Sequence, residues 1–216
     1  MSESLAPTGL ESVLARRVIP VVTLSDADSA TNVAAALVRG GLPIVEVTFR
    51  SDAAEEAIAA IASQTDVRVG AGTVIDSGLV DRAAAAGATF IVTPGFSAPV
   101  VERCLEIGIP VIPGVGGATD IMSALAYGLT VLKLFPADAL GGPKTVRALS
   151  GPFPRVRFVP TGGVTATTAS EYLAIDSVAA VGGSWITPPE AVTSHRFEEV
   201  ERLAAEAVGI CAENER

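Results

Sequence analysis

A single unit recurs along this chain, and it limits the folds that the chain can adopt. The unit is a short run of β-branched and aliphatic residues followed by an alanine-rich stretch, and it returns about every 22 residues. The runs predict eight strands, over residues 17–24, 44–49, 68–74, 89–94, 110–115, 130–136, 157–162 and 178–185. Strands that alternate with helices pair in parallel, because each helix returns the chain to the edge where the next strand begins.

The alanine-rich stretches have the spacing of amphipathic helices, with apolar residues every three or four positions. Asp26, Asp76 and Thr119 precede or open such stretches as N-caps would, and glycines follow several of them. The predicted helices cover residues 28–39, 53–63, 77–86, 99–107 and 119–127, and a short helix near residues 7–15 precedes the first strand.

Eight strand–helix units predict an α/β fold, a single (β/α)8 TIM barrel with a short N-terminal helix, spanning residues 1–216 as one domain. A doubly wound open sheet is the alternative architecture. The first predicted strand is not followed by the G-x-G-x-x-G fingerprint of the dinucleotide-binding version of that fold. We therefore favour the barrel.

Composition excludes several classes of partner. The formal net charge of −9 disfavours nucleic acid and anionic membranes, which attract basic surfaces. We expect no membrane span and no signal peptide, because no apolar run is long enough and the N-terminus lacks a basic segment. Cys104 and Cys211 fit packing roles in a cytoplasmic protein. One histidine, His195, cannot build the common zinc sites, so metal catalysis through imidazole is excluded. No cofactor is expected either.

Lys133 is the residue that most strongly suggests chemistry. It lies in the apolar run V-L-K-L-F-P, although the chain contains only two lysines. Burying an ammonium group is costly unless the group is paired or loses its proton. A neutral amine attacks carbonyl carbon and opens the route to Schiff-base catalysis. The alternative is a lysine at a strand end that reaches solvent.

Other polar residues fall at the ends of the predicted strands, where barrels carry their active sites. Glu46 lies in the apolar strand I-V-E-V-T-F, so its carboxylate is a candidate general acid and base, or else half of a structural ion pair with Lys133 or Arg50. Arg50 can bind a carboxylate with two hydrogen bonds, and Thr73 adds a hydroxyl. A lysine, a glutamate and an arginine together indicate chemistry on an α-keto acid.

Two glycine-rich segments follow the seventh and eighth predicted strands. They read P-T-G-G-V and V-G-G-S-W, and in barrels this position often holds a phosphate on backbone N–H groups. The candidate phosphate ligands are Gly162, Gly163, Gly182, Gly183 and Ser184. Tight turns also require glycine, so either pair alone is weak evidence.

At these residues the chain resembles the 2-keto-3-deoxy-6-phosphogluconate (KDPG) aldolase family, which includes 4-hydroxy-2-oxoglutarate aldolases. The resemblance rests on G-L-P-I-V-E-V-T-F-R and G-L-T-V-L-K-L-F-P-A-D-A-L-G, and it extends in the same order from about Val18 to Trp185. It departs at Gly116, Gly117 and Ala118, where many relatives have a threonine–proline pair.

The resemblance implies a metal-free class I aldolase, a carbon–carbon lyase that reversibly cleaves KDPG to pyruvate and glyceraldehyde 3-phosphate. It implies that Lys133 forms the Schiff base and Glu46 moves protons. Substrate contacts would come from further residues: Arg50 and Thr73 at the carboxylate, Phe135 and Pro94 at the keto-acid pocket, Thr161 in stereochemical preference, and the glycines with Ser184 at the phosphate. Homotrimers in the cytoplasm are common in the family.

Alternative functions stay open at this point. They are cleavage of 4-hydroxy-2-oxoglutarate, cleavage of the galactonate epimer of KDPG, and a barrel that binds a phosphometabolite without catalysis. A phosphosugar epimerase or isomerase is disfavoured, since such barrels use carboxylate pairs or metal-bound histidines.

Overall fold

The computed structural model describes residues 9–64 and 66–214. Its strands are all parallel to their neighbours. They are β1 (Val18–Val22), β2 (Ile44–Thr48), β3 (Arg68–Gly72), β4 (Ile91–Val92), β5 (Val111–Ile112), β6 (Gly114–Val115), β7 (Val131–Leu134), β8 (Arg157–Phe158) and β9 (Val181–Gly183).

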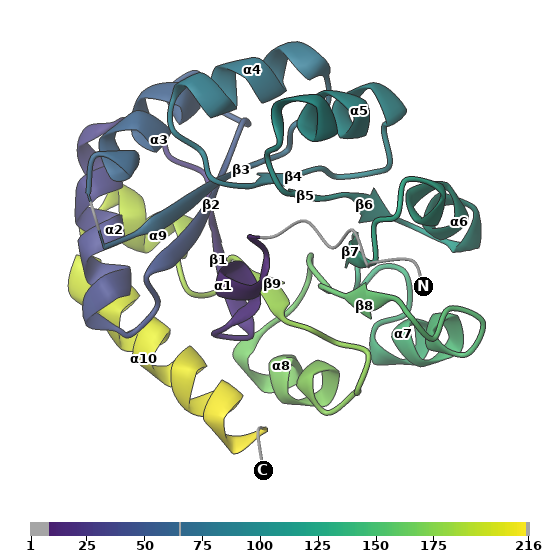
Figure 1. Cartoon of the computed structure of the whole chain (residues 1–216). Helices are drawn as coiled ribbons and strands as arrows, with labels where there is room; N and C mark the ends of the chain where they lie inside the picture. Colours follow the sequence, from purple (N-terminus) through teal and green to yellow (C-terminus); the bar gives the residue numbers. More distant parts are fainter. Residues whose placement is uncertain (1–8, 65, 215–216) are drawn as a thin grey trace.

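Helices follow the strands and lie on the outside of the ring that they form (Figure 1). They are α1 (Glu11–Leu14), α2 (Asp28–Arg39), α3 (Ala54–Ala62), α4 (Ser77–Ala85), α5 (Ala98–Ile107), α6 (Ala118–Ala126), α7 (Pro143–Ser150), α8 (Ala166–Leu173), α9 (Pro189–Thr193) and α10 (Phe197–Glu213). Two of them differ in place from this pattern: α1 lies in the middle of the ring, and α10 packs across α2 and α8.

The strand order confirms a (β/α)8-type barrel with an interrupted ladder. One sheet runs β5-β4-β3-β2-β1-β9 and a second runs β6-β7-β8. The predicted fifth strand is divided into β5 and β6 at Pro113, which has no N–H to give to a neighbour. Between β8 and β9 the ring continues only through single bridges, Phe158 to Val178 and Thr161 to Gly182.

The core has two layers because strand residues alternate between the two faces. Val45 and Val47 of β2 face outward and belong to the large cluster between strands and helices. Ile44 faces inward into a second cluster of buried residues inside the barrel, against which the partly buried Val131 packs. Val13 and Leu14 of helix α1, with Leu10 just before it, close the N-terminal end of this inner cluster.

The predicted helix starts are partly confirmed. The Asp76 carboxylate accepts a hydrogen bond of 2.8 Å from the Leu79 N–H as the N-cap of α4. Asp26 accepts one of 2.7 Å from the Ser29 N–H at the start of α2, and this bond lowers the pKa of the carboxyl group. Thr119 is not an N-cap: it lies inside α6, which begins after Gly117. The N-terminal helix is shorter than predicted, and residues 7 and 8 lie outside the described range.

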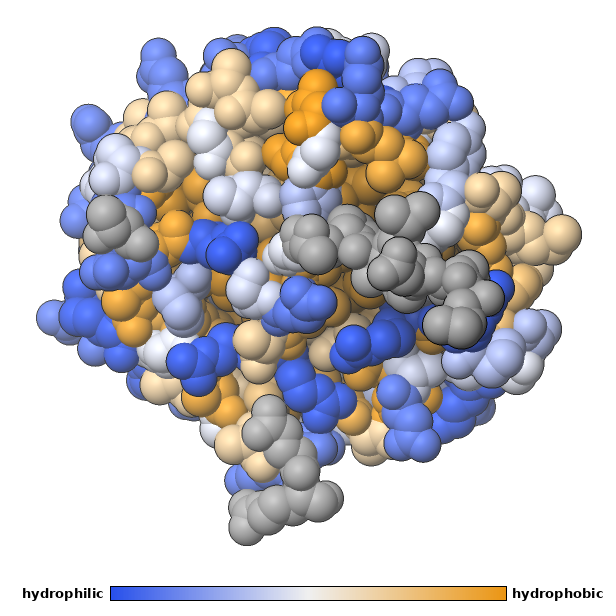
Figure 2. Space-filling view, in the orientation of Figure 1, coloured by the Kyte–Doolittle hydropathy of each residue, from blue (hydrophilic) through white to orange (hydrophobic). Residues whose placement is uncertain are grey.

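The face seen in Figure 2 carries hydrophilic side chains along most of its rim, over the outer helices. Large apolar side chains are exposed at a few places on the molecule, led by Ile75 (62%) and Met122 (64%). No helix within the described residues has the length and apolar character needed to cross a membrane.

Candidate active site

A cavity of about 230 Å³ opens at the C-terminal ends of the strands. Every site residue predicted from the sequence lines it. The lining residues are Val21, Glu46, Thr48, Arg50, Thr73, Pro94, Lys133, Phe135, Thr161, Gly162, Gly163, Val164, Gly182, Gly183 and Ser184. Residues that are far apart in the sequence therefore meet in one place, as the barrel architecture requires.

Lys133 and Glu46 form a buried ion pair on the wall of this cavity. Their side chains are 6% and 3% exposed, and Lys133 Nζ donates to Glu46 Oε1 at 3.1 Å. The alternative of a strand-end lysine that reaches solvent is therefore wrong. The pairing that sequence left open for Glu46 is resolved in favour of Lys133. The Lys133 ammonium also lies 5.2 Å from the centre of the Phe135 ring, within range of a cation–π contact.

Arg50 supplies a positive charge at the mouth of the cavity. It is exposed just beyond the end of β2, and its guanidinium has no carboxylate partner among the residues that the structure describes. An unpaired guanidinium beside a cavity can bind a carboxylate or a phosphate with two hydrogen bonds.

Thr73 is held in an unusual backbone conformation immediately after β3. Its φ is +58°, in the left-handed region that β-branched residues avoid. Hydrogen bonds on both sides hold it there, since the Phe49 N–H donates to the Gly72 carbonyl at 2.8 Å and the Val74 N–H donates to the Val92 carbonyl at 3.3 Å. Such strain is found at functional sites, and here it turns Thr73 to line the cavity.

The glycine-rich segments need glycine for two different reasons. Gly162 and Gly163 have φ values of +91° and +77°, so their backbone turns through two consecutive left-handed residues. Gly182 and Gly183 have no positive φ but are packed closely, because a side chain would overlap Thr161 or Trp185, respectively. Gly163 is needed for both reasons, since a side chain there would also overlap Asp138. Helix α8 begins just beyond Val164, which brings a helix N-terminus next to the first pair.

Val21, Thr48 and Val164 also line the cavity and were not predicted as site residues. Thr48 could have been found, because it shares the inward face of β2 with Glu46. Its hydroxyl lies 2.7 Å from that of Thr23, which leaves one hydroxyl proton of the pair available to another partner. Val21 and Val164 carry no chemical signal that separates them from core valines.

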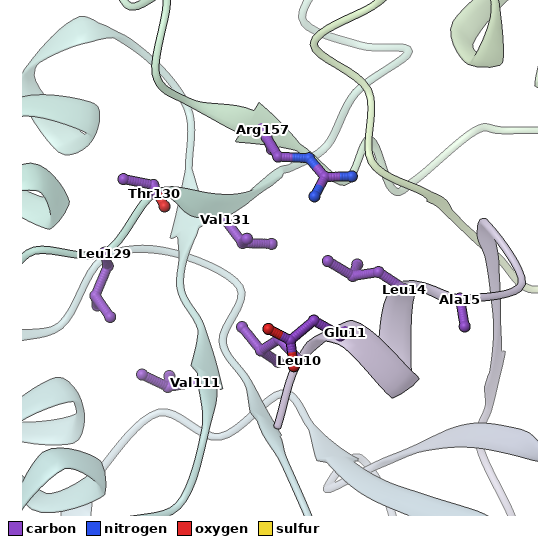
Figure 3. A pocket seen from close by; sticks show the side chains of 9 residues that line it. All are labelled: Leu10, Glu11, Leu14, Ala15, Val111, Leu129, Thr130, Val131 and Arg157. Carbon is purple, nitrogen blue, oxygen red and sulfur yellow. The ribbon is translucent and has the colours of Figure 1, made fainter. Parts of the chain in front are cut away.

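A second cavity, of about 400 Å³, lies at the opposite end of the barrel (Figure 3). It is bordered by α1 and by the first residues of β5, β7 and β8, and its charged lining residues are Glu11 and Arg157. The described residues that line it include no lysine, and their only polar side chains are Glu11, Thr130 and Arg157, so the smaller cavity is the better candidate for Schiff-base catalysis. No three His, Cys, Asp or Glu side chains among the described residues converge as a metal site would require.

The KDPG and KHG aldolase family model matches residues 10–203. The chain belongs to this aldolase family. A 2-dehydro-3-deoxy-phosphogluconate aldolase of Treponema pallidum is 47% identical over 195 residues, which cover 90% of this chain and 93% of the relative. The KHG/KDPG aldolase of Escherichia coli K12 is 40% identical over 203 residues, or 93% of this chain and 95% of the relative.

Solved aldolases of this family have the same fold. The KDPG aldolase of Zymomonas mobilis ZM4, solved with 3-phosphoglycerate, has a TM-score of 0.89 at 38% identity. The match covers 95% of this chain and 97% of the Zymomonas chain. The KDPG aldolase of Legionella pneumophila has a TM-score of 0.89 at 39% identity, with coverages of 93% and 98%. It was captured with pyruvate as a covalent carbinolamine, which is the intermediate of a class I aldolase.

Proposed function

We propose that this aldolase-family enzyme reversibly cleaves KDPG to pyruvate and glyceraldehyde 3-phosphate through a Schiff base on Lys133. The observation that carries the proposal is a lysine buried beside a glutamate on the wall of a cavity. An amine in that position reaches a bound keto group, and the adjacent carboxylate can take and return protons.

Proton transfer from Lys133 to Glu46 produces the neutral amine that the first step needs. The amine attacks the C2 carbonyl carbon of the keto acid to give a carbinolamine. Protonated Glu46 gives its proton to the carbinolamine hydroxyl, which leaves as water, so that an iminium ion forms and Glu46 is a carboxylate again. Glu46 accepts the C4 hydroxyl proton through a water, the C3–C4 bond breaks, and the bonding electrons move to the iminium nitrogen as an enamine forms. Glyceraldehyde 3-phosphate leaves, a proton returns to C3, and water releases pyruvate from Lys133.

The remaining lining residues suit the two anionic ends of this substrate. We assign Arg50 and Thr73 to the carboxylate of the keto acid, and Phe135 and Pro94 to the walls around its carbon chain. Thr161 is assigned to the hydroxyl formed or lost at C4, where it influences which epimer is preferred. Gly162, Gly163, Gly182, Gly183 and Ser184, with the start of α8, are assigned to the phosphate.

A second substrate is 4-hydroxy-2-oxoglutarate, which would give pyruvate and glyoxylate. The relative from Escherichia coli K12 is named KHG/KDPG aldolase, after both substrates. The same lysine and carboxylate-binding residues serve both substrates, while the glycine-rich cradle serves only the phosphorylated one. We therefore expect KDPG to have the higher kcat/KM.

The assembly that we propose is a homotrimer in the cytoplasm. Exposed apolar side chains such as Ile75 and Met122 support association, because burying them in an interface removes apolar surface from water. Two buried cysteines fit a reducing compartment.

Reductive trapping tests the mechanism with an internal control. The chain contains two lysines, Lys133 and the exposed Lys144, so a borohydride-reduced pyruvate adduct can be assigned to one peptide or the other. We expect the adduct on the Lys133 peptide, its loss in Lys133→Ala, and its retention with full KDPG cleavage in Lys144→Ala. Cleavage that persists in Lys133→Ala would refute a Schiff base on this residue.

A further inference from the structure

Strand β3 presents only glycine to the barrel interior in its second half. Val69 and Ala71 belong to the outer cluster, so the alternate residues Gly70 and Gly72 face inward. A side chain at Gly70 would overlap the Phe90 ring, which fills the inner core. The glycine at 70 therefore makes room for packing.

Gly72 makes room for a charged group instead. A Cβ atom at this position would overlap Glu46 Oε1 and would lie 2.7 Å from Cγ and 2.8 Å from Cδ of the same side chain. Oε1 is the oxygen that accepts the hydrogen bond from Lys133 Nζ. The parallel pairing of β2 and β3 sets Gly72 opposite Thr48, so the Glu46 carboxylate leans along its strand into the space above Gly72.

We infer that Gly72 is a positioning residue for the acid–base step, because its missing side chain is the space that holds the Glu46 carboxylate against Lys133. The φ of Gly72 lies outside the left-handed range, so backbone conformation does not account for glycine here. Glu46 is 2% exposed and cannot move its carboxylate into solvent without leaving Lys133. An alanine at 72 would therefore displace Oε1 from the hydrogen bond. This inference rests on the proposed function of Glu46.

A double-mutant cycle that combines Gly72→Ala with Glu46→Ala tests whether glycine is needed at position 72 to make room for the Glu46 carboxylate or for another reason. In the wild-type background, we expect Gly72→Ala to lower kcat for KDPG by about 100-fold, since general acid–base catalysis is worth about that much or more. It should also remove the limb of the kcat/KM–pH profile that Glu46→Ala removes. In the Glu46→Ala background the space is vacant, so adding Gly72→Ala should change neither kcat, within about twofold, nor the thermal midpoint.

Gly209→Ala is the matched control. Gly209 lies in α10, and a methyl group added there would meet no neighbouring atom within 4 Å, so the same chemical change should leave kcat unaltered. If Gly72→Ala alone does not fold, the double variant decides: a fold as stable as that of Glu46→Ala supports the inference, and a second failure to fold overturns it.

An equal loss in both backgrounds, or no loss in either, also overturns the inference. These outcomes differ from failure of the proposed function, in which the wild-type enzyme neither cleaves KDPG nor forms a pyruvate adduct. In that case, the same double-mutant cycle measured by the midpoint of thermal unfolding would still show whether a side chain at position 72 and the Glu46 side chain compete for one space.

Discussion

Lys133 and Glu46 depend on one another because both are charged and both are withdrawn from water. Sequence could place each on the inward face of its strand, since a strand alternates its side chains strictly between two faces. It could not decide between Lys133 and Arg50 as the partner of Glu46. That choice depends on the distance between β2 and β7, which are not neighbours in the sheets.

The free energy of unfolding should show this dependence. Removing one member of a buried ion pair costs about 3–5 kcal/mol, because the other charge stays buried without a partner. We expect losses of that size for Lys133→Met and for Glu46→Met, measured by urea denaturation. The double variant should recover to within about 1 kcal/mol of the wild type, since apolar side chains of similar volume replace the pair. Losses that simply add would show that the two charges are not coupled.

Thr73 provides a second test at this scale, because its hydroxyl and its backbone strain can be separated. Thr73→Gly and Thr73→Ala both remove the hydroxyl, so both should raise KM for the keto acid by similar factors. Only glycine accepts a φ of +58° without cost. Thr73→Gly should therefore be more stable than Thr73→Ala by about 1 kcal/mol in denaturant titrations. Equal stabilities would mean that the left-handed conformation carries no strain.

At the scale of helices and strands, the predicted bounds fail mainly where glycine or proline interrupts regular hydrogen bonding. The helix over 28–39 and the start of the second strand were predicted to the residue, because apolar periodicity continues unbroken through them. The fifth strand was predicted as one element and is two, since Pro113 interrupts its hydrogen bonds. The eighth was predicted over 178–185, but regular pairing is confined to Val181–Gly183.

The glycine pairs also look alike in sequence and differ in structure. Gly162 and Gly163 are required by backbone conformation, and Gly163 also by the close approach of Asp138, whereas Gly182 and Gly183 are required by neighbouring side chains alone. That difference comes from backbone dihedral angles and from the side chains that pack against each glycine, which the glycine pairs themselves do not reveal.

A substitution in the segment between β8 and α8 should therefore weaken binding of the phosphorylated substrate more than binding of the unphosphorylated one. In Gly163→Ala, the new methyl group meets Asp138 and the φ of +77° becomes unfavourable, so the N–H groups of this segment move. We expect KM for KDPG to rise about tenfold, equivalent to about 1.4 kcal/mol. KM for 4-hydroxy-2-oxoglutarate, which has no phosphate, should stay within about twofold. Equal changes for both substrates would contradict a phosphate site at this segment.

The whole barrel followed from the repeated unit, because parallel strands joined by helices have few ways to bury both faces of the sheet. Its two ends were not equally predictable. The catalytic end contains lysine, glutamate, arginine and paired glycines, which have recognisable chemistry. The cavity at the other end is lined mainly by α1 and apolar residues, and nothing in the sequence distinguished these from core.

The proposed homotrimer can be tested at the scale of the whole molecule, through the exposed apolar side chains that an interface would bury. Multi-angle light scattering should give a mass three times that of the 21.9 kDa chain. Ile75→Lys combined with Met122→Lys should shift the protein toward lower mass, because burying two ammonium groups in an interface is costly. Asn32→Lys adds the same kind of charge to an exposed position on α2 and should leave the mass unchanged. A wild-type monomer at micromolar concentration would refute the trimer, and a trimer that survives both lysines would show that Ile75 and Met122 lie outside its interface.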